Sequence, residues 1–130
     1  MNEHSFIKSV HRYLPSDFFK WKIHDTYTSG VPDTFYAGPA GILFVEYKYV
    51  KNLPKKDSTC VKTTLSYLQI QWLNKMVEFN QNAALVIGCE DTAVILTDKE
   101  WVNDLTKKEY LERAIPRKHV ATWIVKACLG

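Results

Sequence analysis

The chain has 130 residues, of which 46% are hydrophobic and 24% are charged, with a formal net charge of +3 at pH 7. This length suits one ordinary domain and this composition excludes disordered and collagen-like chains, so we expect a single globular domain over residues 1–130. The apolar runs, such as Gly41–Val45 and Ala83–Ile87, are far shorter than the ~20 residues of a membrane-spanning helix, which predicts a soluble protein.

The first part of the chain is predicted to form one helix followed by one strand. Residues Glu3–Leu14 place apolar side chains at helical spacing, and Pro15 closes the segment, which indicates an amphipathic helix. Residues Phe18–Tyr27 are aromatic and β-prone, and apolar and polar side chains alternate from Trp21 onward, as in a half-buried strand.

A β-hairpin is predicted next. Ser29–Pro32 is a turn signal before the short run Asp33–Tyr36, and Gly38–Gly41 makes a second turn. Ile42–Val50 is then a strong strand whose two faces are both largely apolar, as expected for a central strand covered on both sides. The second turn can return the chain so that this strand runs beside Asp33–Tyr36.

A loop, a helix and two strands follow. Asn52–Thr63 reads as a lysine-rich loop, and Leu65–Phe79 carries apolar side chains at helical spacing with Ser66 near its start. Ala83–Gly88 and Thr92–Thr97 are predicted as further strands.

The C-terminal third carries weaker patterns. Lys99–Arg113 is predicted to be helical, and Val120–Val125 fits either a final strand or a helix. The order helix, strands, helix, strands predicts an α/β or α+β domain with a mixed central sheet flanked by helices.

The chain start and the cysteines bear on the cellular compartment. The polar segment Met1–His4 shows no charged-then-apolar leader, so we expect a cytoplasmic location. Cys60, Cys89 and Cys128 are widely spaced and odd in number, which argues against a disulfide framework or a zinc ribbon. We interpret them as buried or idle thiols.

Two charged residues interrupt the most hydrophobic strand of the sequence. Glu46 and Lys48 point to the same side of that strand, about 7 Å apart along it, because strand side chains alternate with period two. Ionised groups in such a stretch are costly unless they are paired or bind a metal. A simple Glu46–Lys48 ion pair, or exposure on an edge strand, is the alternative for this motif alone.

A second carboxylate supports a metal site. Asp33 stands at the start of the strand that the hairpin brings beside Ile42–Val50, so the carboxylates of Asp33 and Glu46 can converge. Mg²⁺ keeps several waters and prefers carboxylates supplemented by phosphate oxygens of a substrate, and Lys48 would lie beside such a phosphate. The sequence therefore predicts a site for Mg²⁺, with Mn²⁺ as a substitute, and no small-molecule cofactor.

Lysines gather locally although the net charge is mild. Five of them fall in one short stretch with Asp57 as the only acid there, namely Lys48, Lys51, Lys55, Lys56 and Lys62. Lysines that neutralise a nucleic-acid backbone give salt-dependent affinity, although a solvated lysine loop explains the cluster equally well. Lys22 is a further candidate for phosphate contact, with an exposed strand lysine as its alternative. His4, His11 and His119 lack the spacing of metal-binding histidines and receive no ligand role, and His24 is interpreted as structural rather than catalytic.

Together, Pro32-Asp33 and Glu46-Tyr47-Lys48, thirteen residues from Asp33 to Glu46, resemble the paired signature of the PD-(D/E)XK nuclease superfamily. A narrower resemblance, to the small stand-alone VRR-NUC nucleases of phages, runs from about Glu3 to Leu96. It is carried by Lys22-Ile23, Ser29-Gly30-Val31-Pro32-Asp33, Phe44-Val45-Glu46-Tyr47-Lys48, Leu65-Ser66-Tyr67-Leu68-Gln69 and Trp72-Leu73.

The resemblance implies a restriction-endonuclease-like core and a role for each signature residue. Asp33 and Glu46 would hold the metal with the backbone carbonyl of Tyr47, whose bulky side chain faces the other way. Lys48 would orient or activate the attacking water and stabilise the charge that develops on the phosphate.

Two further residues receive roles from the resemblance. Glu3 occupies the place of an acidic residue on the first helix, where it would serve a second metal site or its water shell. Gln69 would reach from the following helix toward the lysine, the metal-bound water or the phosphate, with a surface glutamine as its alternative.

The expected function is Mg²⁺-dependent endonucleolytic cleavage of DNA that leaves a 5′-phosphate. The resemblance implies branched or Holliday-junction DNA as the substrate, a homodimer that cuts two strands, and the host-cell cytoplasm as the location if a phage encodes the chain. One alternative is a sequence-specific restriction-like or homing endonuclease that uses the Asn52–Thr63 loop for base contacts. The other is a non-catalytic nucleic-acid-binding module with the same fold, held together by the Glu46–Lys48 ion pair.

Overall fold

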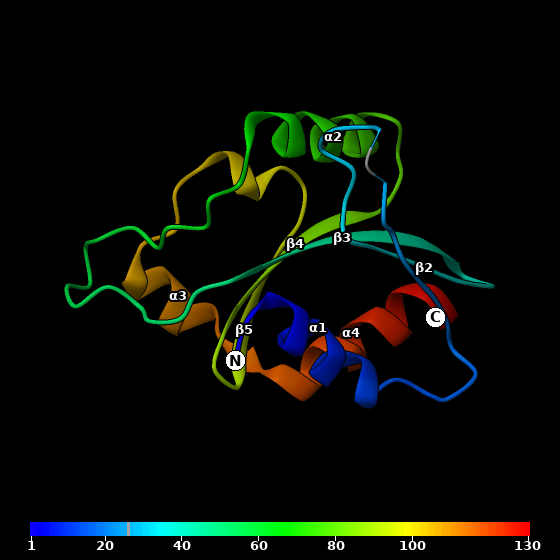
Figure 1. The fold of residues 1–130 in the computed structure, drawn as a ribbon, viewed down its shortest axis with the longest axis horizontal. Coiled ribbons are helices and arrows are strands. Elements are labelled where there is room, and N and C mark those ends of the chain that lie inside the picture. The colour runs from blue at the N-terminus through cyan, green and yellow to red at the C-terminus, as the bar shows by residue number, and fades with distance from the viewer. Residues whose placement is uncertain (26) are drawn as a thin grey trace.

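The computed structural model describes residues 1–25 and 27–130. Their strands form one mixed six-stranded sheet (Figure 1). The strands lie in chain order, and every neighbouring pair is antiparallel except β3 and β4, which are parallel. Their bounds are β1 Phe19–Lys22, β2 Thr34–Gly38, β3 Gly41–Tyr49, β4 Ala83–Cys89, β5 Thr92–Leu96 and β6 Ile115–Pro116.

Helices cover both faces of the sheet, as Figure 1 shows, with α2 on one face and with α1 and α4 on the other. Their bounds are α1 Glu3–Arg12, α2 Tyr67–Glu78, α3 Lys107–Arg113 and α4 Arg117–Leu129, with a short 3₁₀ helix, η1, at Glu100–Val102. The prediction of a mixed central sheet flanked by helices is confirmed.

The period of two in the central strands divides the core into two layers. Leu43, Val45 and Tyr47 of β3 pack with α1 and α4, because they point to that face. Phe44 points to the opposite face, into the layer that contains Leu73 of α2. All seven residues of β4 are buried, as expected for a central strand with both faces covered.

Side-chain caps explain where three helices begin. Asn2, Ser66 and Thr106 each accept a hydrogen bond from the backbone N–H three residues further on, and the side chain at that position returns a bond to the cap backbone. Such capping boxes satisfy backbone donors that would otherwise lack partners at a helix start. Ser66 was expected near the start of its helix, and it is the cap of α2.

The predicted strand Phe18–Tyr27 is too long, because β1 ends at Lys22. One further ladder bond joins the backbone N–H of Ile23 to the carbonyl of Asp33. Asp25 then turns the chain, since its carboxylate accepts hydrogen bonds from the backbone N–H groups of Tyr27 and Thr28. The part of that prediction at Thr26 lies outside the described residues.

The single helix predicted over Lys99–Arg113 is wrong, because the segment divides into η1 and α3. Asp98 and Lys99 both have positive φ angles, which makes a turn before η1, and Asn103 is extended after it. Thr106 then starts a new helix as its cap. The open prediction for Val120–Val125 resolves as helix within α4, and β6 was not predicted.

The three cysteines are free thiols, with Cys89 and Cys128 buried and Cys60 partly buried. Across residues 1–25 and 27–130, we find no helix with the length and apolar character that crossing a membrane requires.

Candidate active site

Asp33 and Glu46 face each other at the open end of the β2–β3 hairpin. The antiparallel register pairs Thr34 with Val45, so its continuation by one residue sets Asp33 opposite Glu46. Directly opposite residues of an antiparallel pair carry their side chains on the same face. Asp33 Oδ2 accepts a hydrogen bond of 2.9 Å from the backbone N–H of Tyr47, which fixes the Asp33 carboxylate against β3.

The Glu46 carboxyl group is buried, with 3% of the residue exposed. Its Oε2 atom accepts a hydrogen bond of 3.0 Å from Gln69 Nε2 and lies 3.6 Å from Lys48 Nζ. Its Oε1 atom is buried and has no hydrogen-bond partner among the described residues. Burial first, and the negative charge of Asp33 second, raise the pKa of Glu46 to about 8.

Lys48 and Gln69 reach Glu46 from two different elements. Lys48 lies two residues further along β3 and therefore on the same face, with 15% of its side chain exposed. Gln69 comes from the first turn of α2, and its Oε1 atom also accepts a hydrogen bond from the backbone N–H of Ser66. Gln69 thus both closes the cap of α2 and donates to the carboxylate, so the start of α2 is tied to β3.

Gly30 sets how closely the chain before Asp33 approaches α2. Its φ angle is +85°, and a Cβ atom there would lie 2.4 Å from the backbone carbonyl oxygen of Leu68. A glycine is required at such a position, because any side chain would collide with helix backbone. The Ser29–Pro32 turn therefore packs directly on the first turn of α2, next to Gln69.

Glu3, at the first position of α1, belongs to the same electrostatic group. It is half-buried, and its pKa is raised by burial first and by the charge of Asp33 second, whereas Lys48 and Lys22 lower it. Lys22 Nζ is 2.7 Å from His4 Nδ1, so the start of α1 also contacts the end of β1.

A buried hydrogen-bond chain supports the opposite face of β3, and sequence reasoning missed it. Tyr47 OH bonds to Tyr36 OH at 2.8 Å, and Tyr36 OH bonds to His11 Nε2 at 2.7 Å. Burial lowers the pKa of His11 to about 4, with the nearby charges of Lys20 and Lys22 adding to the effect. The alternation of side chains along β3 predicted that the Tyr47 ring lies on this face. No sequence pattern pointed to the bond from Tyr47 to Tyr36 or to the bond from Tyr36 to His11.

The structure brings four of the predicted site residues together, namely Asp33, Glu46, Lys48 and Gln69. The fifth, Glu3, is linked to them through the mutual influence of their charges. The lysine-rich loop is a different region, because backbone hydrogen bonds tie it to the start of α3. These bonds join Lys107 to Thr59 and Lys108 to Asp57, and Figure 1 shows the loop beside α3. Its lysines, Lys55, Lys56 and Lys62, are exposed, and so is Lys51 directly before the loop.

The donor set fits a magnesium ion that shares its coordination with a substrate. In the part of the chain that the structure describes, no group of three or more His, Cys, Asp or Glu side chains is arranged around one ion position. Mg²⁺ does not require such a group, because one or two carboxylates, waters and substrate phosphates complete its octahedron. Among the described residues, Glu46 Oε1 has no hydrogen-bond partner, and the residue stands across the hairpin from Asp33, so this oxygen is available to a cation.

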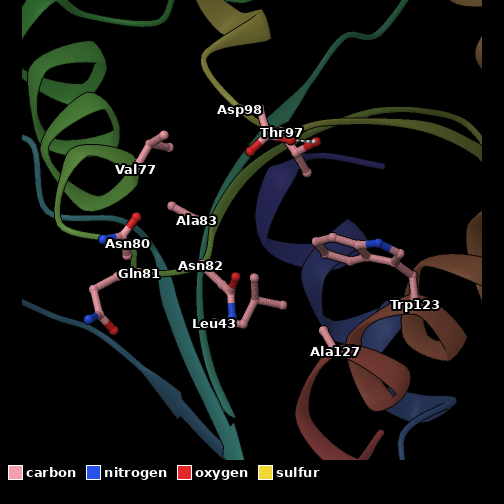
Figure 2. Close-up of a pocket in the computed structure, with 10 residues that line it drawn as sticks. All are labelled: Leu43, Val77, Asn80, Gln81, Asn82, Ala83, Thr97, Asp98, Trp123 and Ala127. Atoms are coloured by element: carbon pink, nitrogen blue, oxygen red, sulfur yellow. Dashed lines mark hydrogen bonds between the residues drawn. The ribbon is translucent and has the colours of Figure 1, made fainter. Parts of the chain in front are cut away.

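A large hollow of the molecule lies away from these carboxylates. It has a volume of about 560 Å³ and lies at the other end of β3, lined by Leu43, Asn82 and Thr97 among others. Figure 2 shows Trp123 and Ala127 of α4 on one side of it and Val77 of α2 on the other. Asp98 is the only acidic residue in its lining, so it lacks the paired carboxylates of the candidate active site.

Comparison with known proteins establishes the fold. No protein-family model and no curated protein sequence matches this chain. Among solved structures, it is similar to Archaeoglobus fulgidus Hjc, a Holliday junction resolvase from an archaeal hyperthermophile. The similarity has a TM-score of 0.55 at 13% sequence identity, and it covers 94% of this chain and 97% of that chain. The expected restriction-endonuclease-like core is thereby confirmed as the fold.

Proposed function

We propose that this protein is a divalent-metal-dependent endonuclease that hydrolyses phosphodiester bonds in DNA. The observation that carries the proposal is the pairing of Asp33 with Glu46 across the open end of the hairpin. Lys48 lies on the same face, and one buried oxygen of Glu46 has no partner among the described residues. A buried carboxylate oxygen left in this way is costly for a purely structural residue, and a bound cation would satisfy it.

Each residue of the candidate active site would have a different role in phosphodiester hydrolysis. Asp33, Glu46 and the backbone carbonyl of Tyr47 would hold Mg²⁺, with Mn²⁺ as a substitute, and Glu3 would serve a second ion or its waters. The ion supplies charge neutralisation and an acidified water molecule. Lys48 would orient the attacking water and stabilise the negative charge that develops on the scissile phosphate. Gln69 holds the Glu46 carboxylate in place through its hydrogen bond of 3.0 Å.

We further propose branched DNA, such as a Holliday junction, as the substrate and a homodimer as the active form. The fold shared with a solved Holliday junction resolvase supports the substrate, and the signature sequence supports assignment to the VRR-NUC nucleases. Two active sites are needed to cut two strands of one junction, which is the reason for the dimer. Light scattering of the active protein tests it, and a strictly monomeric active form would refute it.

A non-catalytic DNA-binding module is the second candidate function, because one observation favours it. Lys48 and Glu46 lie 3.6 Å apart and already form an ion pair without a cation. In such a module, the signature residues would only hold the fold together. DNA affinity would then be the same in Mg²⁺ and in chelator.

The test is cleavage of labelled four-way-junction, flap and linear duplex DNA in Mg²⁺ and in chelator. Asp33→Asn is the informative variant, because the asparagine carbonyl can still accept the hydrogen bond from Tyr47 while the negative charge is lost. Lys48→Met removes the ammonium group and keeps an unbranched side chain. The matched controls are Asp17→Asn and Lys75→Met, both at exposed positions.

We expect metal-dependent cutting by the wild type and by both controls, and its loss in Asp33→Asn and Lys48→Met. Preference for junction or flap over linear duplex supports the branched substrate, whereas cutting of one linear duplex at one site favours a sequence-specific endonuclease. Binding without cutting of any substrate in either condition would sink the nuclease proposal in favour of the binding module.

A further inference from the structure

The edge strand β1 presents two exposed faces of different chemistry. Phe19 and Trp21 point to the α2 side of the sheet, and 59% of Phe19 and 56% of Trp21 is exposed. Lys20 and Lys22 alternate with them and point to the other side, where both influence His11 of α1. The expectation that Trp21 lies on the buried face of a half-buried strand is therefore wrong, because α2 covers the centre of the sheet and leaves this edge open.

The two exposed rings are the outer end of a continuous row of aromatic side chains. Phe19 and Trp21 contact Phe35 edge-on, with ring centroids 6.1 and 6.3 Å apart. Phe35 contacts Phe44 at 5.0 Å, and Phe44 contacts Trp72 of α2 at 4.8 Å. Because the inner rings are anchored under α2, the outer rings are held in place although they face solvent.

This aromatic edge adjoins the candidate active site. Trp21 and Lys22 line an open hollow of about 470 Å³ together with Val31, two residues before Asp33. Lys22 also lowers the pKa of Glu3, which belongs to the carboxylate group. Asp25 is the one acid in the lining, and its Oδ1 atom already accepts hydrogen bonds from the backbone of Tyr27 and Thr28.

We propose, on the basis of the proposed nuclease function, that Trp21 and Phe19 form a stacking platform for unpaired bases of the DNA strand whose phosphate lies at Asp33 and Glu46. The rings on one face of β1 can stack on bases, and the lysines on the other face can attract the negatively charged phosphates of the DNA backbone. Aromatic rings interleaved with cations are the recognition chemistry of single-stranded nucleic acid. The platform would select substrates with unpaired bases beside the cleaved bond, such as flaps and opened branch points.

A second copy of the chain is a poorer occupant of this edge. Antiparallel pairing of two β1 strands would bring Lys20 and Lys22 of one copy beside those of the other. Like charges in such positions are destabilising, and lysines on an edge strand are a common protection against strand pairing. Charge complementarity therefore favours DNA over a second copy.

The test is the affinity of the full chain for labelled oligonucleotides, measured by fluorescence anisotropy in chelator, so that no cleavage is needed. One probe is a flap with unpaired bases, and the other is a fully paired duplex of the same length. The variants are Trp21→Ala and the conservative Trp21→Phe, with Phe79→Ala as the matched control at a ring that is 62% exposed on the far end of α2. Thermal unfolding confirms that each variant is folded.

We expect Trp21→Ala to weaken binding of the flap by about 5- to 30-fold and to leave the duplex unchanged, with Trp21→Phe restoring most of the loss. Quenching of intrinsic fluorescence by the flap should also decrease in Trp21→Phe. Equal losses on flap and duplex, or none, would overturn the platform. A change of oligomeric state in Trp21→Ala, measured by light scattering, would also overturn the platform, because this face would then join two copies of the chain. Flap selectivity without cleavage by the wild type would instead refute the nuclease and retain the platform.

Discussion

Burial of the Glu46 carboxyl group opposes folding in the absence of a cation. Only 3% of the residue is exposed, Asp33 repels its negative charge, and one of its oxygens has no partner in the described part of the chain. Gln69 and Lys48 both interact with Oε2, so they offset the cost of burying the carboxylate at only one of its two oxygens. Glu46 therefore lowers the stability of the metal-free protein, and cation binding would remove this cost.

We predict that Glu46→Gln stabilises the metal-free protein at pH 8 by roughly 1–3 kcal/mol, because it removes a buried charge and keeps an acceptor for Gln69. The folded-state pKa of about 8 lies above the ordinary 4.5, so stability from this group is full below pH 4.5 and is lost as the pH rises through 8. Denaturant titrations from pH 4.5 to 8 should show that loss in the wild type and not in the variant. Equal pH dependence of both proteins would contradict the prediction, with exposed Glu112→Gln as the control.

His11 acts in the opposite direction on the pH scale. Its folded-state pKa of about 4 lies below the ordinary 6.5, so the stability it contributes is full above pH 6.5 and is lost as the pH falls through 4. We predict that His11→Gln, which can still bond to Tyr36 OH, flattens the decline of the melting temperature between pH 6.5 and 4. A decline as steep as in the wild type would show that other groups cause it.

At the scale of elements, the site depends on how the turn before β2 packs on α2. Gly30 lies against the backbone of Leu68, and the next residue of α2, Gln69, holds Glu46. The position of the turn before Asp33 relative to α2 is thus set by a backbone-to-backbone contact that only glycine permits.

We predict that Gly30→Ala destabilises the protein by roughly 2–4 kcal/mol, because the new Cβ both collides with Leu68 and occupies a left-handed conformation. Cleavage by the folded fraction should also decrease, since α2 must move and carry Gln69 away from Glu46. Urea unfolding and single-turnover cleavage measure the two effects. The neighbouring exposed Ser29→Ala should change neither, and an unaltered stability of Gly30→Ala would contradict the proposed packing.

Local patterns predicted the elements that surround the signature residues and missed features that depend on distant contacts. Short stretches of neighbouring residues determine the apolar strand β3, the turn at Gly38–Gly41 and the cap at Ser66. The convergence of Asp33, Glu46 and Lys48 could therefore be predicted from the sequence. The bond from Gln69 to Glu46 spans 23 positions. The family resemblance placed Gln69 near the site, but directed it toward Lys48, the water or the phosphate and not toward Glu46.

The misses have specific physical causes. Trp21 looks like a core residue by its type, but 56% of it is exposed, because it lies at the edge of the sheet on the face whose centre α2 covers. Periodicity over Lys99–Arg113 suggested one helix, but the positive φ angles of Asp98 and Lys99 and the cap at Thr106 divide the segment. These outcomes are set by tertiary packing and turn conformation, which helical spacing alone does not encode.

At the scale of the whole molecule, the charge is mild but unevenly placed. The net charge is +3, and the exposed lysines of the loop after β3 lie on the segment that leaves the strand bearing Glu46 and Lys48. If the proposed function holds, a duplex arm that extends from the candidate active site along β3 would meet this loop, and each phosphate that a lysine neutralises there would release counterions.

We predict that Lys51→Ala, Lys55→Ala and Lys56→Ala combined reduce the salt dependence of junction binding. The slope of log affinity against log salt should decrease by about 0.9 for each phosphate that is no longer neutralised, hence by up to about 2.7. Binding titrations at several salt concentrations in chelator measure it. A control with the same charge change, in exposed Lys8, Lys118 and Lys126 on the opposite helices, should leave the slope unchanged. Equal effects of the two triple variants would point to net charge alone.

The most direct measurement of the central claim is calorimetric titration of the metal-free protein with Mn²⁺, without DNA. The proposed pairing of Asp33 with Glu46 predicts saturable binding by the wild type and by the Asp17→Asn control, and heats at background level for Asp33→Asn and Glu46→Gln. Saturable binding of equal strength in all four proteins, or background heats in the wild type, would contradict a metal site at these carboxylates.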